Sequence, residues 1–233
     1  MIRNKFKKLL PSFLYQSFKK VYHILRFYNL INPNYSTTDS ITFGSLDAGS
    51  FLKKKIINAK FFLEFGSGNT TIFANDNKTS FYSVESDKNF FTYMRKKKKI
   101  ENIFFFSLGF VEFYSYPLFS SSTLKFFYKN KAKTYASKIF ERLTNNSIKP
   151  DLILVDGRYR VLCMLNIFKF LNKNDLSKTC VVLDDFKDRE HYEIIKKFFD
   201  VSYLGRLGIC YLKDQTSSIS VDQLIEEFSN DPR

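Results

Sequence analysis

Two glycines beside an acidic residue form the sharpest local pattern in this sequence. Glu64 lies in the apolar run at residues 61–65, and Gly66 and Gly68 follow that run directly. Glycines at the junction of a strand and a helix let the backbone turn tightly and approach a ligand closely. A dinucleotide fingerprint would place a third glycine at position 71, where this chain has Thr71. The pattern therefore predicts a ligand site on a glycine turn that differs from a typical dinucleotide site.

A second acidic residue, Glu85, ends the next apolar run, 21 positions after Glu64. An acid at about this distance from a glycine turn accepts hydrogen bonds from ribose hydroxyls in nucleoside-binding folds. The methyl donor S-adenosylmethionine (SAM) has no phosphate and carries an ammonium and a sulfonium, to which the Glu64 carboxylate is suited. A nicotinamide or other nucleotide site is an alternative, and so is a structural role for Glu64 as a cap or ion-pair residue. The residues expected to bind the cofactor SAM are Glu64, Gly66, Ser67, Gly68, Thr70 and Glu85.

A carboxylate and two guanidinium groups follow the apolar run at residues 151–155. They belong to Asp156, Arg158 and Arg160, and open α/β sheets bind ligands at the carboxyl ends of their strands. Asp156 could serve as a general base toward a hydroxyl or as a metal ligand. Arg158 and Arg160 could hold an acidic substrate through paired hydrogen bonds. In the structural alternative, Asp156 orders the turn and the two arginines pair with surface acids.

Two adjacent acids, Asp184 and Asp185, end the apolar run at residues 179–183. If that run lies beside the strand that carries Asp156, three carboxylates meet and could hold a divalent cation. A helix cap formed by Asp185 explains the same residue without any metal. His191 follows nearby and is a further catalytic candidate, although a single histidine at the start of a helix is more often simply exposed. The candidate metal ligands are Asp156, Asp184 and Asp185.

With these patterns, the sequence resembles the class I SAM-dependent methyltransferases, whose first motif is an acidic residue, any residue and then Gly-x-Gly after the first strand. Here the motif occupies residues 64–68, and the resemblance covers about residues 58 to 213. It implies that SAM is held around this turn. The spacing of Asp156 and the pair Asp184 and Asp185 is also similar to catechol-type O-methyltransferases, where an acid after strand four and an Asp-Asn pair after strand five hold magnesium.

Two longer patterns look like a methyltransferase-like group that includes plant glucuronoxylan O-methyltransferases, which act on acidic sugars in polysaccharide. The patterns are Val-Asp-Gly-Arg-Tyr-Arg at residues 155–160 and Asp-Asp-Phe-x-x-Arg-x-x-Tyr at residues 184–192. A histidine is expected in that group where this chain has Asp184, and His191 is the nearby substitute. The resemblance implies an acceptor side lined by Asp156, Arg158, Asp185, Arg189 and Tyr192. The catalytic candidates are Asp156, Asp185 and His191, and the expected substrate-binding residues are Arg158, Arg160, Arg189 and Tyr192.

Short apolar runs alternate with amphipathic stretches along most of the chain, which is typical of a parallel sheet wrapped by helices. Residues 201–205 and 208–212 lie so close together that they must pair antiparallel. The expected fold is α/β, with a Rossmann-like seven-stranded methyltransferase sheet that is mostly parallel and ends in an antiparallel hairpin. Residues 114–146 are expected to form a helix with an insertion over the site. Strands are expected at 60–65, 80–85, 102–107, 151–155 and 179–183, and helices at 70–76, 87–98, 160–171 and 188–199.

The composition is that of one globular domain. The 233 residues are 44% hydrophobic and 26% charged, which allows a sizeable core but no second full domain. Cys163, Cys180 and Cys210 each lie in an apolar run, which indicates reduced, buried thiols in a cytosolic protein. The sequence has no CxxC motif and two histidines, so it offers no ligand set for structural zinc.

The first 38 residues form a basic arm with seven Lys or Arg and no Asp or Glu, half of the net charge of +14. Apolar residues are interleaved with these charges, and Pro11 interrupts the pattern, so we expect one or two amphipathic helices. No uncharged run reaches the roughly 20 residues that a bilayer requires, and a signal peptide fits poorly. The arm could attach the protein peripherally to an anionic membrane surface, or it could pack its apolar face on the domain.

These features predict a cytoplasmic SAM-dependent O-methyltransferase that modifies a hydroxyl near Asp156 on a sugar or surface glycan, with an acidic glycan as a candidate acceptor. The alternatives are a nucleic-acid or small-molecule methyltransferase and a non-catalytic, membrane-associated protein that binds SAM or a nucleotide. No Asn/Asp-Pro-Pro-Tyr motif for a flipped base follows the fourth strand, which makes a nucleic acid acceptor the weaker choice. The expected divisions are a basic arm and linker at 1–38, a SAM-binding domain at 39–214 and a C-terminal tail at 215–233.

Overall fold

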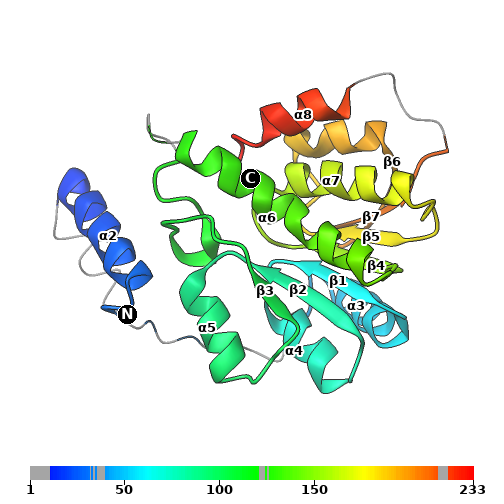
Figure 1. The fold of residues 1–233 in the computed structure, drawn as a ribbon, viewed down its shortest axis with the longest axis horizontal. Coiled ribbons are helices and arrows are strands. Elements are labelled where there is room, and N and C mark those ends of the chain that lie inside the picture. The colour runs from blue at the N-terminus through cyan, green and yellow to red at the C-terminus, as the bar shows by residue number, and fades with distance from the viewer. Residues whose placement is uncertain are drawn as a thin grey trace.

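A seven-stranded sheet forms the centre of the molecule (Figure 1). The computed structural model describes residues 11–31, 33, 35, 40–120, 124, 126–214 and 220–233. The strand order is β3-β2-β1-β4-β5-β7-β6, in which β1 to β5 run parallel and β7 pairs antiparallel with both β5 and β6. The strands are β1 (Phe62–Phe65), β2 (Phe81–Glu85), β3 (Ile103–Phe105), β4 (Leu152–Val155), β5 (Cys180–Leu183), β6 (Phe199–Leu204) and β7 (Leu207–Leu212).

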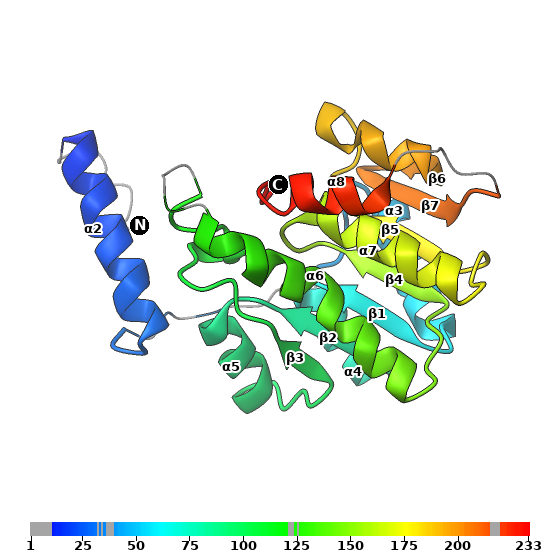
Figure 2. The same ribbon diagram turned by 45° about the horizontal axis from the view of Figure 1, so that its top comes forward.

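Helices cover both faces of the sheet, and two hydrophobic clusters hold them there. Side chains alternate between the faces of a strand, so Leu63 and Phe65 enter one cluster and Phe62 enters the other. The first cluster packs α6 (Phe126–Asn145) and α7 (Arg160–Lys173), and the second packs α3 (Leu46–Asn58), α4 (Asn69–Asp76) and α5 (Lys88–Lys96). Figure 2 shows the first pair of helices on one side of the sheet and the others on the opposite side.

Local sequence explains where several of these elements begin. The Ser45 hydroxyl accepts a hydrogen bond from the Ala48 amide at the start of α3, and the Asp87 carboxylate accepts two from the first turn of α5. Both are preferred helix-capping residues. The central strands β4 and β5 are buried along their whole length, as expected for parallel strands covered on both faces. This layering brings the loops after β1, β2, β4 and β5 to one edge of the sheet.

The fold predicted from the sequence is confirmed, including the terminal hairpin and the seven strands. The expected helix at 188–199 is instead a run of 3₁₀ turns, η3 (Glu190–Lys197). Tyr192 and Ile195 are both buried, and a spacing of three residues puts them on one side of a helix with three residues per turn. The helix within 114–146 is α6, which follows a loop over the sheet edge. The sequence pattern did not predict α3.

Residues 220–233, expected to belong to a tail, pack on the domain. They include α8 (Val221–Phe228), whose apolar residues contact the same cluster as α7. The carbonyl groups of Pro232 and Arg233 accept hydrogen bonds of 3.2 and 2.9 Å from the amides of Tyr159 and Arg160, where α7 begins. The end of the described chain therefore supports the loop that carries Asp156.

Two further expectations concern the thiols and the membrane. Cys163, Cys180 and Cys210 are free and buried, as predicted. Among the residues that the structure describes, none of the helices has the length and apolar character needed to span a bilayer. The arm forms helix α2 (Ser12–Phe27), which stands at the edge of the molecule beside α5 in Figures 1 and 2. Residues 1–10, 32, 34 and 36–39 of the arm and linker lie outside the described residues.

Candidate functional site

The glycine turn after β1 touches the loop after β4, backbone against backbone. Gly66 has a φ of +95°, and a Cβ atom at this position would lie 2.6 Å from the Cα of Gly157. Only glycine fits such a backbone and such a contact. Gly68 differs, because a Cβ atom there would meet no atom of the described chain within 4 Å. The turn is thus closed on the Gly66 side and open beside Gly68, where a ligand can approach the backbone.

Glu64 lies beneath this turn and supports it. Its carboxylate is fully buried and accepts hydrogen bonds from the hydroxyls of Thr70, Thr71 and Ser83, the last at 2.8 Å. Burial raises the pKa of Glu64, and the three hydroxyl donors oppose that shift. The carboxylate thus joins the first turn of α4 to β2 and fixes the shape of the glycine turn. The contact with the positive charges of a ligand that the sequence predicts stays a prediction.

Glu85 is anchored through one carboxylate oxygen. Its Oε1 accepts hydrogen bonds from the amides of Ser86 and Asp87, at 2.6 and 2.7 Å, and from the Ser115 hydroxyl at 3.2 Å. Within the described residues, no hydrogen bond involves Oε2, which is therefore free to hydrogen-bond with a ligand hydroxyl. Burial raises the pKa of Glu85 to about 8, and the nearby Asp87 carboxylate adds to that shift.

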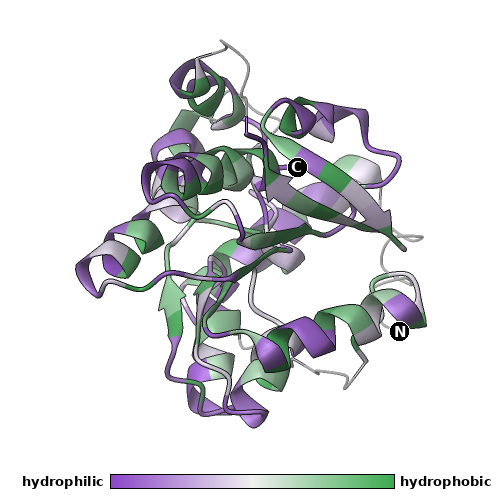
Figure 3. Cartoon of the chain, turned by 90° about the vertical axis from the view of Figure 1, so that its right-hand side faces the viewer, coloured by the Kyte–Doolittle hydropathy of each residue, from purple (hydrophilic) through white to green (hydrophobic). Residues whose placement is uncertain are grey.

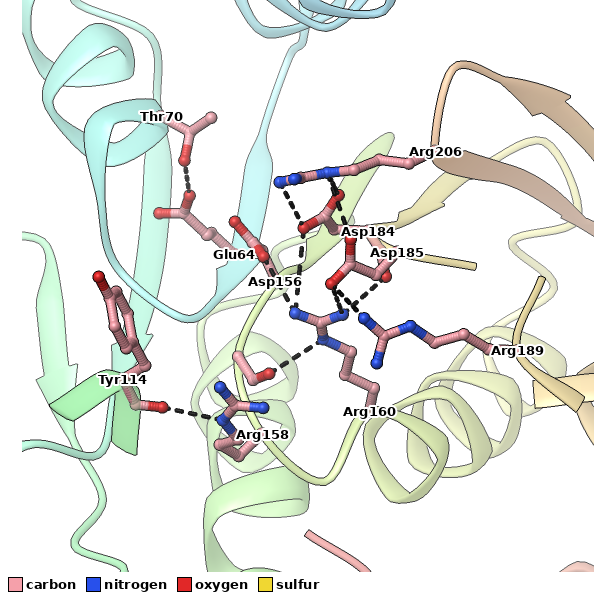
Figure 4. A network of polar contacts seen from close by, with 11 residues as sticks. Glu64, Thr70, Tyr114, Asp156, Arg158, Arg160, Asp184, Asp185, Arg189 and Arg206 are labelled. Atoms are coloured by element: carbon pink, nitrogen blue, oxygen red, sulfur yellow. Dashed lines mark hydrogen bonds and ion pairs between the residues drawn. The ribbon is translucent and has the colours of Figure 1, made fainter. Parts of the chain in front are cut away.

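The loop at residues 109–118, here named the strap, crosses from Glu85 to the loop after β4. Its two ends pair through backbone hydrogen bonds, of which one joins the Leu118 amide to the Phe110 carbonyl at 3.0 Å. Tyr114 and Ser115 at its tip both have left-handed backbone angles, a conformation often found at functional sites. Arg158 donates from Nε to the Tyr114 carbonyl at 2.8 Å (Figure 4). The strap therefore links the side chain that we expect to hold a ribose to a candidate acceptor-binding arginine.

Three carboxylates and three arginines interlock at the ends of β4 and β5 (Figure 4). Arg206 binds the buried Asp184 carboxylate through two hydrogen bonds of 2.6 and 3.0 Å, a bidentate pair. Asp185 lies 2.8 Å from Arg189 and 3.3 Å from Arg160. Arg160 also reaches Asp156 at 3.3 Å and the Asp184 carbonyl at 2.9 Å. Opposite charges are therefore paired throughout this network.

The metal site predicted at Asp156, Asp184 and Asp185 is not supported. The three side chains do come together, but guanidinium groups stand where a cation would have to bind. In the part of the chain that the structure describes, no group of three His, Cys, Asp or Glu side chains is arranged to hold a metal ion. A divalent cation would have to displace arginines that already balance these charges.

Asp156 is the most accessible of the three carboxylates, with 32% of its side chain exposed, against 2% for Asp184. Desolvation raises its pKa well above the ordinary value for aspartate, and the adjacent Asp184 carboxylate adds to this effect, while Arg160 opposes it. A carboxylate that holds a proton more firmly is a stronger base. Asp156 thus combines access from solvent with the basicity that proton removal from a hydroxyl requires.

The expected acceptor residues fall into two groups. Arg160 and Tyr192 are buried, and Arg160 directs its hydrogen bonds to the protein, so both support the site from within. Arg158 and Arg189 are more accessible, with 42% of the Arg189 side chain exposed. His191 lines a separate surface cavity of about 660 Å³ together with Arg189. No hydrogen bond or ion pair of the described residues joins His191 to Asp156 or Asp185, so the structure does not unite the three expected catalytic residues.

Sequence reasoning missed three residues at this edge of the sheet. Arg206 lies in the β6–β7 turn, and the antiparallel register that pairs Leu183 with Gly208 brings it to Asp184. The predicted hairpin could have revealed this contact, because its turn must lie beside the end of β5. The Tyr135 hydroxyl lies against Gly157, where an added Cβ atom would be 2.1 Å away. Neither Tyr135 nor Ser115 has a sequence motif, because their positions depend on how α6 and the strap pack.

Helix α2 holds the segments on both sides of Glu85. Arg26 is buried, forms an ion pair of 2.8 Å with Asp87, and donates to the strap carbonyls of Val111 and Glu112 at 2.9 and 3.1 Å. Asp87 is the residue whose amide binds Glu85, and the strap carries the Ser115 hydroxyl that also binds it. The arm is thus part of the wall around Glu85, although the sequence indicated no contact between them.

Comparison with solved structures places this architecture among known folds. A methyltransferase-like protein from Silicibacter pomeroyi aligns with a TM-score of 0.62 and 21% identity, over 78% of this chain and 93% of that one. An SAH-bound methyltransferase from Podospora anserina aligns with a TM-score of 0.40 and 14% identity, over 88% of this chain and 89% of that one. No protein-family model matches the sequence, and no curated protein sequence matches it significantly. The first likeness shows that this chain has a methyltransferase-like fold.

Proposed function

We propose that this protein is a SAM-dependent O-methyltransferase. The observation that carries the proposal is the pairing of a glycine turn, open beside Gly68, with a glutamate that ends the neighbouring strand and keeps Oε2 free. Gly68 lets the backbone approach the donor, and Glu85 forms hydrogen bonds with its ribose hydroxyls. Ser67 and Thr70 complete the turn. Glu64 and Gly66 hold its shape through the contacts beneath it.

The acceptor side of the proposed site lies around Asp156. Bound SAM would supply the methyl group, which leaves its sulfur as a new bond to the acceptor oxygen forms. Asp156 removes the proton of the acceptor hydroxyl, and the adjacent Asp184 carboxylate makes it a better base. Arg160 holds the Asp156 carboxylate in place from the buried side. Most of the rate enhancement then comes from positioning and proton removal.

Acidic sugars are the acceptor class that we propose for this site. Arg158 and Arg189 lie on either side of Asp156 and Asp185 (Figure 4), and both are accessible enough to bind a carboxylate. Arginine binds carboxylates through two parallel hydrogen bonds, which orients as well as attracts them. A uronic acid residue in a glycan provides a carboxylate and several hydroxyls within the size of one sugar ring.

The transfer reaction itself tests this proposal. SAM with a tritiated methyl group is incubated with oligosaccharides that contain glucuronic acid, and with the neutral glucose equivalents. We expect label on the acidic acceptors only. In Asp156→Asn, transfer should fall by about 100-fold or more because the general base is lost, whereas SAM affinity should stay unchanged.

The matched control for that variant is Asp200→Asn, which changes an exposed aspartate on β6. It should leave the transfer rate unchanged. Transfer to neutral sugars alone would contradict the acidic acceptor class. Full activity in Asp156→Asn would contradict the role of Asp156.

We further propose that the protein works in the cytoplasm, in part on a membrane surface where glycans are assembled. Three buried, reduced thiols suit a reducing compartment, and the excess positive charge of residues 1–38 suits an anionic surface. Fractionation of cells that express the chain tests the location. Protein that sediments with membranes and is released by high salt supports peripheral attachment, and a wholly unsedimented protein contradicts it.

A further inference from the structure

Helix α2 docks on the domain through one side. Lys19, Tyr22, His23 and Arg26 follow the helical spacing of three and four residues, so they line that side together. Tyr22 and His23 pack their rings against Phe113, with centroid distances of 6.1 and 5.2 Å. Arg26 is buried in its ion pair on the same side. Phe27 adds an aromatic contact with Phe110 of the strap, with ring centroids 4.9 Å apart. This docking leaves several large apolar residues of the helix exposed.

Those apolar residues form a stripe on another side of α2. The apolar stripe consists of Leu14, Phe18, Val21 and Leu25, again three and four residues apart, with Phe13 next to it. Phe13 and Phe18 are 67% and 62% exposed, and Val21 and Leu14 are exposed as well. Figure 3 shows hydrophobic and hydrophilic residues mixed along the helices that surround the sheet. A docked helix that still exposes large apolar side chains marks an interaction surface.

The charge of the arm identifies what this surface contacts. Residues 1–38 carry seven Lys or Arg and no acidic residue, and Lys20 is exposed on α2 itself. A basic helix with an exposed apolar face is typical of segments that lie in the plane of a membrane interface. We propose that the apolar stripe of α2 inserts into the surface of a bilayer that contains anionic lipids, while the basic residues of the arm other than Lys19 and Arg26 contact the lipid headgroups. This inference deepens the proposed membrane attachment and rests on it, but it does not depend on methyl transfer.

Two other occupants are less suited to the stripe. A second copy of this chain would bring together two arms that each carry five basic residues besides Lys19 and Arg26, which pair with acids of the domain, and like charges repel. A nucleic acid would satisfy the charges, but its phosphates make no use of exposed phenylalanine and valine side chains. The anionic bilayer is the partner that matches both the apolar and the basic component.

Vesicle flotation with the full-length protein tests this proposal. One vesicle is made of phosphatidylcholine, and the other also contains phosphatidylglycerol. The test variant carries Phe13→Gln, Phe18→Gln and Val21→Gln, since glutamine keeps helix propensity while removing exposed apolar surface. The matched control carries Leu46→Gln and Ile57→Gln, two exposed apolar residues on α3 that are 79% and 54% exposed. Circular dichroism and thermal unfolding confirm that both variants are folded.

We expect the wild type and the control to float with the anionic vesicles and to bind the neutral ones at least about tenfold more weakly. The stripe variant should lose about tenfold or more in binding to anionic vesicles. Equal flotation of the stripe variant and the wild type would overturn the proposal, as would a wild-type dimer in light scattering that this variant converts to a monomer. Because no SAM is present, failure here is distinguishable from failure of the methyltransferase proposal.

Discussion

Glu64, Glu85 and Asp156 are acidic side chains at one edge of the sheet. Glu64 and Glu85 are buried, whereas Asp156 is partly exposed. Each has a raised pKa, and in each case desolvation is the first cause. Their hydrogen-bond partners differ, because hydroxyls surround Glu64, backbone amides hold Glu85, and a guanidinium holds Asp156. Acidic residues therefore shape a turn, present a free carboxyl oxygen and provide a base at this site.

The raised pKa of Glu85 predicts how stability changes with pH. The native protein keeps this proton up to about pH 8, whereas the unfolded chain loses it near the ordinary value of 4.5. Because the native state then binds more protons, the free energy of unfolding should fall as the pH rises through this window. Other buried acids act in the same direction, so Glu85→Gln should reduce the slope without abolishing it.

Urea unfolding at a series of pH values between these limits measures the slope. Glu101→Gln, which changes an exposed acid, is the control and should keep the wild-type dependence. An equal slope in Glu85→Gln and in the wild type would show that Glu85 is ionised in the native protein across this range.

The two glycines of the turn should respond differently to the same substitution. Gly66→Ala places a Cβ atom 2.6 Å from the Gly157 backbone at a φ of +95°, so we expect a loss of about 2–4 kcal/mol in the free energy of unfolding. Gly68→Ala meets open space and should cost less than about 1 kcal/mol. Chemical denaturation compares the two. A Gly66→Ala protein as stable as Gly68→Ala would contradict the contact between the two loops.

Single site residues could be predicted where a glycine or an acidic residue stands at the end of an apolar run. The glycine turn and the acids at strand ends stand out because they interrupt apolar runs. The partners of those acids could not be predicted in the same way. Arg160 resembles a substrate-binding residue from its position after β4, yet the structure buries it against Asp156 and Asp185. Whether an arginine faces solvent depends on the neighbouring loops, which the local sequence does not specify.

At the scale of elements, the strap and α2 form one unit around Glu85. Arg26 joins them, and Phe113 of the strap packs beneath its guanidinium at 4.7 Å. Burial raises the pKa of Asp87, and the Arg26 charge opposes that shift. An ion pair buried this deeply, with 1% and 6% of the two side chains exposed, depends on both partners.

Breaking that ion pair on one side should destabilise the protein more than removing both charges. Arg26→Met leaves Asp87 buried without its cation, so the free energy of unfolding should fall by about 3–5 kcal/mol. Adding Asp87→Asn should recover part of the loss, since asparagine keeps the helix cap on α5. Urea denaturation measures both variants.

Lys19→Met is the matched control, because Lys19 forms an ion pair between α2 and Glu112 that is partly exposed. It should change the free energy of unfolding by less than about 1 kcal/mol. If Arg26→Met were no more harmful than Lys19→Met, α2 would not be an integral part of the wall around Glu85.

Elements with strong periodicity were predictable, and those defined by tertiary contacts were not. The strands that carry the site residues were expected within a few residues of their observed bounds. The strap has no periodic pattern, and its path depends on Arg26 and Tyr128. Helix α8 was missed although it has the apolar spacing of an amphipathic helix and a serine cap, as seen at Ser220, Val221, Leu224, Ile225 and Phe228.

At the scale of the whole molecule, the sheet order places the proposed donor and acceptor sites side by side. β1 lies between β2 and β4, so the loops that carry Gly66, Glu85 and Asp156 adjoin one another. The alternation of strands and helices was sufficient to predict this architecture. It did not predict that the basic arm docks beside Glu85, because the arm contacts the domain through isolated polar and aromatic residues.

Calorimetric titration of the purified protein measures whether the glycine turn and Glu85 bind SAM. We predict micromolar SAM binding, no binding of NAD, and a loss of at least about tenfold in SAM affinity for Glu85→Gln. Glu101→Gln should bind SAM like the wild type. A folded protein that does not bind SAM, or a Glu85→Gln variant with unchanged affinity, would show that this turn and Glu85 are not the donor site.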